Sequence, residues 1–278
     1  MALDIARSSL YSGQINLWVE DALTRDYLDA LWNEPAVKFL IGGGREGVQA
    51  ILKDAEEAGY RNVYCVIDRD FGKSNHADWS TPGKTFRRFV LPRHEIENDL
   101  LEASALQASS YQNRGLDLQS IEDRRLGKSR DLLWWSACRE VIAVLRGRFR
   151  ESFVPDPTQS VADEKVAFDH ICESDWFRKL ATETGNSSRK DVLSLLKKSH
   201  AQANRRLENG EWRQDFAGKE ILRDVAGWMC DRAKIPKFPT SDSEFYSDLA
   251  KQVARWQAAN QKAPGDLVDL LHALKNRI

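Results

Sequence analysis

Short apolar runs alternate with amphipathic stretches through the first hundred residues. Runs of β-branched and aromatic residues predict strands, and apolar residues three or four positions apart predict helices. We expect strands over 14–20, 36–41, 61–70 and 85–91, and helices over 22–32, 45–59 and 94–106. The stretch 61–70 is the strongest strand prediction, because five apolar residues follow one another, as in parallel strands covered on both faces. The alternation predicts an α/β fold, with a parallel sheet flanked by helices.

The rest of the chain has a different pattern, in which helical periodicity dominates and strand signals are nearly absent. Helices are predicted over 128–149, 162–182, 188–207, 217–233, 241–259 and 264–277. The stretch 108–126, rich in Ser, Gln, Asn and Arg, separates the two patterns. We therefore predict an α/β domain over 1–107 and an α-helical region over 108–278, which can share its core with the first.

Composition and charge narrow the function classes only slightly. The net charge is −1, which argues mildly against a dedicated nucleic-acid binder, although a nuclease needs just one basic face near its metals. The four cysteines form no CxxC pair, which argues against structural zinc. No apolar run is long enough to span a bilayer, and the first residues lack the pattern of a signal peptide. We expect a cytoplasmic protein without a membrane segment.

Acidic side chains follow two of the predicted strands. Asp68 and Asp70 stand two positions apart after the third strand, so both side chains point to the same face. Glu20 ends the first strand in the same way. Ligands of open α/β sheets bind at the carboxyl ends of strands, and Mg²⁺ needs only a few carboxylates besides water. These three acids predict a divalent-metal site, with Glu20 able to act instead as a general acid or base. The simpler alternative is that such an acid caps a helix.

A second polar cluster, HEIENDLLE, begins the helix predicted after the fourth strand. Glu95 and Glu97 are in its first turn, where acids complement the helix dipole without any further role. His94 could instead contact a substrate phosphate, and Asn98 could bind a metal-bound water. Both the structural and the functional interpretation stay open for all four residues.

Two further motifs lie at predicted helix starts. The GGGR run at 42–45 could hold an anion with its backbone amides, but it lacks the pattern of a phosphate-binding P-loop, and a tight strand-to-helix turn is the simpler interpretation. Lys219 would begin a helix, where a cation opposes the helix dipole. It could stabilise a phosphate or a transition-state charge, or it could simply be solvated.

The acidic motifs resemble those of toprim domains, which carry a Glu at the end of the first strand and a DxD at the end of the third. Here these are LWVE and VIDRD. VIDRDF (66–71), HEIENDLL (94–101) and GKEIL (218–222) also match, in order, one branch of toprim nucleases, which includes the PARIS anti-phage effector AriB. The OLD-family nucleases are more distant relatives. The resemblance covers about the first 105 residues and one later motif.

The resemblance implies Glu20, Asp68, Asp70 and Glu97 as ligands of Mg²⁺ or Mn²⁺ and as catalytic acids, with Lys219 as a charge stabiliser. It implies a toxic nuclease that an ABC-type ATPase partner keeps inactive. The active form would be a homodimer that cleaves nucleic acid, with RNA such as transfer RNA favoured over DNA as the substrate. One departure favours an alternative, because Thr24 stands where another acid is common. The chain could then be a toprim-fold docking module of an ATPase complex with little activity. A metal-free nucleotide-binding domain would explain the glycine run, but neither DxD nor HEIEN.

Overall fold

A parallel sheet of four strands forms the centre of the amino-terminal part. The computed structural model describes residues 11–69, 87–111, 116–147, 157, 161–184, 188–211, 216–234 and 242–277. The strands are β1 (Ile15–Val19), β2 (Val37–Ile41), β3 (Val63–Ile67) and β4 (Arg88–Val90). They are arranged in the order β2-β1-β3-β4, and every neighbouring pair is parallel. The predicted parallel sheet is therefore confirmed, and β1 and β3 lie side by side.

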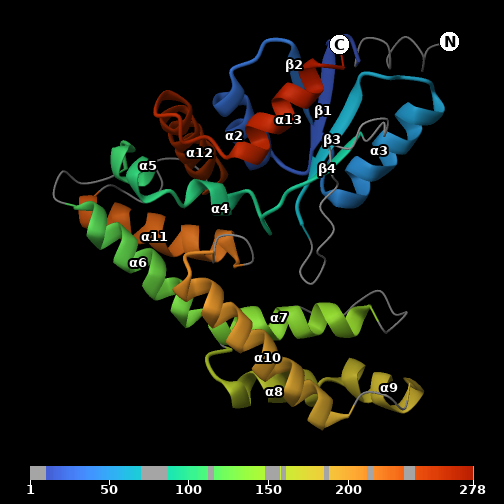
Figure 1. The fold of residues 1–278 in the computed structure, drawn as a ribbon, viewed down its shortest axis with the longest axis vertical. Helices are drawn as coiled ribbons and strands as arrows, with labels where there is room; N and C mark the ends of the chain where they lie inside the picture. Colours follow the sequence, from blue (N-terminus) through green and yellow to red (C-terminus); the bar gives the residue numbers. More distant parts are fainter. Residues whose placement is uncertain are drawn as a thin grey trace.

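Alternate side chains of the central strands enter two different cores. Trp18 of β1 and Cys65 of β3 pack under α3 (Arg45–Glu57), which covers one face of the sheet (Figure 1). Leu17 and Val66 point to the opposite face and join the main core. Because the period of a strand is two residues, an unbroken apolar run fills both faces.

The last two helices of the chain return to the main-core face of the sheet. There α12 (Asp242–Ala259) packs along α2 (Ala22–Trp32), and α13 (Gly265–Lys275) lies beside them (Figure 1). The buried Tyr27 hydroxyl donates a hydrogen bond to Gln257 Oε1 at 2.8 Å, which ties α2 to α12. The main core runs without a break from β1 to α13, so residues from both ends of the chain cover the same face.

The other helices of the described chain lie between β4 and α12, and those from α6 onward form the carboxyl-terminal half that was predicted to be helical. They are α4 (Glu97–Leu100), α5 (Ala103–Ala108), α6 (Leu118–Asp131), α7 (Leu133–Arg146), α8 (Glu164–Cys172), α9 (Asp175–Thr184), α10 (Arg189–Glu208) and α11 (Gly218–Ala233). None of the helices in these described ranges combines the length and apolarity that a membrane crossing requires. The four cysteines are buried and free, as small core residues.

Three predicted helical stretches are each interrupted. The stretch 94–106 contains α4 and α5, because Glu102 adopts an extended backbone (φ −74°, ψ 112°) between them. The stretch 162–182 contains α8 and α9, and the stretch 128–149 overlaps both α6 and α7. Helix α6 also begins inside the polar segment 108–126 that was expected to separate the two parts. Local periodicity does not register such breaks, since both pieces keep an apolar face toward the same core.

Candidate functional site

The ends of β1 and β3 bring Glu20 and Asp68 together. The two strands are parallel neighbours with Val19 opposite Val66, so the segments that follow β1 and β3 leave the sheet at the same edge. Glu20 Oε1 accepts a hydrogen bond from the Asp68 backbone N–H at 2.9 Å. The carboxylate of Glu20 therefore points toward the DxD strand end. Asp70, the other acid of that motif, lies outside the described residues.

A third acid approaches the same edge from α4. Glu97 is only 8% exposed although it carries a carboxyl group. Burial, followed by repulsion from Glu95, raises its pKa to about 8. Burial and then repulsion from Glu97 and Glu20 raise the pKa of Asp68 well above its ordinary range. Glu20, Asp68 and Glu97 therefore interact electrostatically, and full ionisation of the three carboxyl groups is unfavourable unless a cation or a proton is bound.

Glu95 and His94 have partners that fix the surrounding backbone. The Glu95 carboxylate accepts a hydrogen bond from the Lys219 backbone N–H at 2.9 Å, which satisfies one free amide at the start of α11. His94 Nδ1 lies 2.7 Å from the carbonyl oxygen of Arg69, so this nitrogen carries the proton and donates. Burial would raise the pKa of Glu95, but His94, whose Nε2 lies 3.3 Å from Glu95 Oε1, and the Lys219 amide outweigh it and lower the pKa. Glu95 therefore stays ionised as a structural cap.

The HEIEN and GKEIL motifs, 120 residues apart in the chain, are in direct contact. Asn98 Nδ2 donates to the Phe216 carbonyl at 3.1 Å and to the Glu95 carbonyl at 3.3 Å. A Cβ on Gly218 would lie 2.6 Å from the Asn98 backbone nitrogen, closer than real side chains allow. The glycine of the second motif is therefore required by its close approach to the first.

We expect Gly218→Ala to destabilise the protein by about 1–3 kcal/mol, because the added methyl group must displace the backbone of α4. Urea unfolding at neutral pH measures the effect. Gly127→Ala is the matched control, since Gly127 also lies inside a helix but has open space where its Cβ would be, and a Gly-to-Ala change there should stabilise. Equal stability of the two variants would contradict the packing argument.

The glycine run at 42–44 forms a tight turn between β2 and α3. Gly43 and Gly44 have φ values of 75° and 103°, which side chains rarely adopt. The amides of Gly42 and Gly44 donate to the carbonyl oxygens of Val19 and Glu20. These two amides are already occupied, so the structure favours the turn over an anion cradle. The turn also directs the Arg45 guanidinium to the Asp68 carbonyl oxygen, to which it donates.

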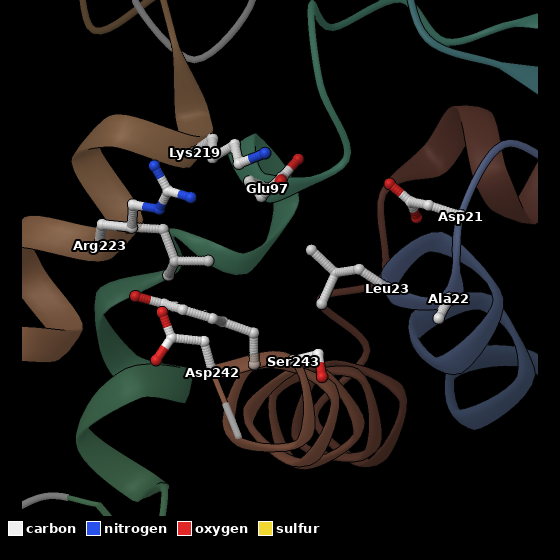
Figure 2. A pocket seen from close by; sticks show the side chains of 10 residues that line it. Asp21, Ala22, Leu23, Glu97, Lys219, Arg223, Asp242 and Ser243 are labelled. Atoms are coloured by element: carbon white, nitrogen blue, oxygen red, sulfur yellow. The ribbon is translucent and has the colours of Figure 1, made fainter. Parts of the chain in front are cut away.

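A cavity of about 330 Å³ opens beside the acidic edge (Figure 2). Its wall includes Glu97, and the Lys219 ammonium group points toward the Glu97 carboxylate in Figure 2. Asp21 is on the opposite side of the cavity, where its Oδ1 caps α2 by accepting the Thr24 N–H at 2.8 Å. The further lining residues, which sequence reasoning missed, are Ala22, Leu23, Leu222, Arg223, Asp242, Ser243 and Tyr246.

The structure describes three of the four predicted metal ligands. Among the residues that the structure describes, no three His, Cys, Asp or Glu side chains converge as a metal-binding group. Of the predicted set, Glu20, Asp68 and Glu97 interact electrostatically, and Asp70 is outside the described ranges. Comparison of the chain with protein-family models, with curated proteins and with solved structures finds no match.

Proposed function

We propose that this chain is a toprim-type, metal-dependent nuclease, a phosphodiesterase that cleaves RNA, such as transfer RNA, in preference to DNA. The observation that carries the proposal is the raised pKa of both Asp68 and Glu97 beside Glu20. Buried carboxyl groups that also repel one another destabilise the fold when they are ionised, and a divalent cation would offset both effects. Perturbed acids beside a cavity are also typical of catalytic sites.

The residues present fit Mg²⁺ or Mn²⁺. Both ions prefer carboxylate oxygens, and Mg²⁺ keeps several waters, so Glu20, Asp68, Asp70 and Glu97 would suffice to hold one or two ions. Asn98 offers a further acceptor near these motifs, because its Oδ1 is buried and has no hydrogen-bond partner among the described residues. Such an oxygen can accept a hydrogen bond from a water of a bound ion. When bound, the ion would stabilise charge on the phosphate and acidify its water.

The protein's own groups have separate duties in this proposal. Glu20 is held at the strand edge by the hydrogen bond that its carboxylate accepts from the Asp68 amide. Glu97, whose pKa is about 8 in the metal-free protein, can hold a proton near neutral pH and would release it when a cation binds. Lys219 projects its ammonium group to the same place and would offset the charge of a phosphate. His94 and Glu95 orient the backbone around these groups.

The wider role is proposed from the order of the motifs. We infer a toxic effector of an anti-phage system, kept silent by an ABC-type ATPase partner and active as a homodimer. The ordered set VIDRDF, HEIENDLL and GKEIL supports this inference, together with the contact between the last two motifs. A genome neighbourhood that holds an ATPase gene beside this one would be expected.

Metal dependence is the direct test of the nuclease proposal. The purified chain should cleave a mixture of transfer RNAs with Mg²⁺ or Mn²⁺ in the millimolar range, and an excess of EDTA should stop cleavage completely. Titration calorimetry on the EDTA-stripped protein should detect the same ions. Cleavage of DNA with RNA left intact would overturn the RNA assignment. No metal binding and no cleavage would favour the docking module instead.

A further inference from the structure

The cavity beside Glu97 is built from four separate parts of the chain. The beginning of α2 supplies Leu23, α4 supplies Glu97, α11 supplies Leu222, and the beginning of α12 supplies Tyr246 (Figure 2). Since Glu97 belongs both to the acidic edge and to the cavity wall, the cavity begins where the proposed catalytic site ends. A polymer bound across the acids would therefore place its next unit at this opening.

The wall of the cavity combines apolar side chains with charged groups. Leu23, Leu222 and Tyr246 provide the apolar part. Tyr246 is half-buried, and its ring meets Phe245 edge-on at 5.0 Å, which limits its movement. Burial raises the pKa of Tyr246 to about 12, so the phenol remains neutral near a phosphate. An aromatic ring that is held in place and uncharged is a suitable platform for stacking.

Both cationic and carboxylate side chains line the cavity around Tyr246. Lys219 and Arg223 come from the first turns of α11, and the Arg223 side chain, which is 51% exposed, forms an ion pair with Glu220 at 3.5 Å. Asp242 begins α12, and Asp21 lies across the cavity (Figure 2). The cations suit a phosphate, whereas the carboxylates can accept hydrogen bonds from N–H groups. A ligand that has a phosphate, an aromatic plane and an N–H edge matches all three features.

We propose that this cavity is a nucleobase subsite, which takes the base next to the scissile phosphate and stacks it on Tyr246. The inference rests on the proposed function, because the nuclease site supplies the position of the phosphate. Ligand pockets of about 300–1,000 Å³ hold drug-sized molecules, so about 330 Å³ suits one base with its sugar. Carboxylate acceptors favour bases with an exocyclic amine, which are guanine, adenine and cytosine, over uracil.

Nucleoside monophosphates test the subsite without any cleavage. In EDTA, calorimetry and saturation-transfer NMR should detect binding of guanosine, adenosine and cytidine 5′-monophosphates, with uridine 5′-monophosphate about tenfold weaker. Tyr246→Leu keeps apolar bulk but removes the ring, and should weaken binding about tenfold, while Tyr246→Phe should bind as the wild type does. Asp242→Asn should reduce the preference for amine-bearing bases.

The matched control is Tyr60→Leu. Tyr60 is also half-buried and also meets another ring edge-on, at 4.8 Å from Tyr11, but it packs in the α3 core away from the cavity. Its replacement should leave nucleotide binding unchanged. Absence of binding by all four monophosphates, or equal binding by Tyr246→Leu and the wild type, would overturn the subsite.

The two proposals fail in different ways. Nucleotide binding that depends on Tyr246, without metal-dependent cleavage of any nucleic acid, would overturn the nuclease proposal and leave a nucleotide-binding cavity. Metal-dependent cleavage without nucleotide binding would overturn the subsite alone. Cleavage products that share one amine-bearing base beside the cut, with that preference lost in Tyr246→Leu, would support both.

Discussion

Replacing Glu20 by Gln should lower the proposed nuclease activity at least ~100-fold while the protein remains folded. Loss of a group that merely supports a metal ligand typically costs ~10–100-fold, and a direct ligand should cost more. A glutamine oxygen can still accept the Asp68 N–H, which Glu20 Oε1 accepts at 2.9 Å, so the local backbone keeps its bond. The variant removes only the negative charge, and titration calorimetry should show weaker Mg²⁺ binding in parallel with the lost cleavage.

The melting temperature of Glu20→Gln distinguishes a role of Glu20 in metal binding from a role in folding. Because Glu20 repels Asp68, Glu20→Gln should melt at the same temperature as the metal-free wild type or above it. Glu57→Gln is the matched control, since the Glu57 side chain is 67% exposed at the end of α3 and forms a surface ion pair with Lys53. The control should retain full cleavage. Full cleavage by Glu20→Gln itself would mean that the catalytic acids are elsewhere.

The sheet and its acidic edge were accessible from sequence because both depend on local patterns. The run Val63–Ile67 is apolar on both faces, so a covered parallel strand follows from the residues alone. Alternation of strands and helices then requires that parallel strands end at one edge, which places Glu20 near Asp68 once β1 and β3 are neighbours. The helix from Ala22 to Trp32 was likewise predicted to the residue, since its apolar spacing is regular.

The cavity could not be predicted, because its walls meet only through the tertiary fold. Tyr246 and Leu23 are more than 200 residues apart, and α12 reaches α2 by packing that no local period encodes. The same holds for Gly218, whose only local property is a place at a helix start. A glycine is required there because the backbone of Asn98 lies too close to leave room for a methyl group. Burial also gives Glu97 its raised pKa, and that burial could not be predicted, because its sequence position is equally that of an ordinary acid in a first helical turn.

Replacing Glu97 by Gln should increase the free energy of unfolding of the metal-free protein at pH 8 by several kcal/mol. The pKa of Glu97 is about 8 in the folded protein, compared with ~4.3 in an unfolded chain. Between these values the folded state binds the extra proton, so stability falls as pH rises from about 4.3 to about 8. Glutamine resembles the protonated acid and avoids this loss, so the two proteins should differ little at pH 4 and most at pH 8.

Urea unfolding in EDTA from pH 4 to pH 8 measures the difference, and Glu57→Gln should follow the wild type throughout. Part of the slope should survive in Glu97→Gln, because the pKa of Asp68 is also raised and acts with the same sign. Millimolar Mg²⁺ should restore wild-type stability at pH 8 and do less for the variant, since the cation replaces the proton as the partner of the acids. A wild type whose stability does not fall toward pH 8 would show that burial and the neighbouring acids do not disfavour charge on Glu97, and the main argument for a cation at this edge would be lost.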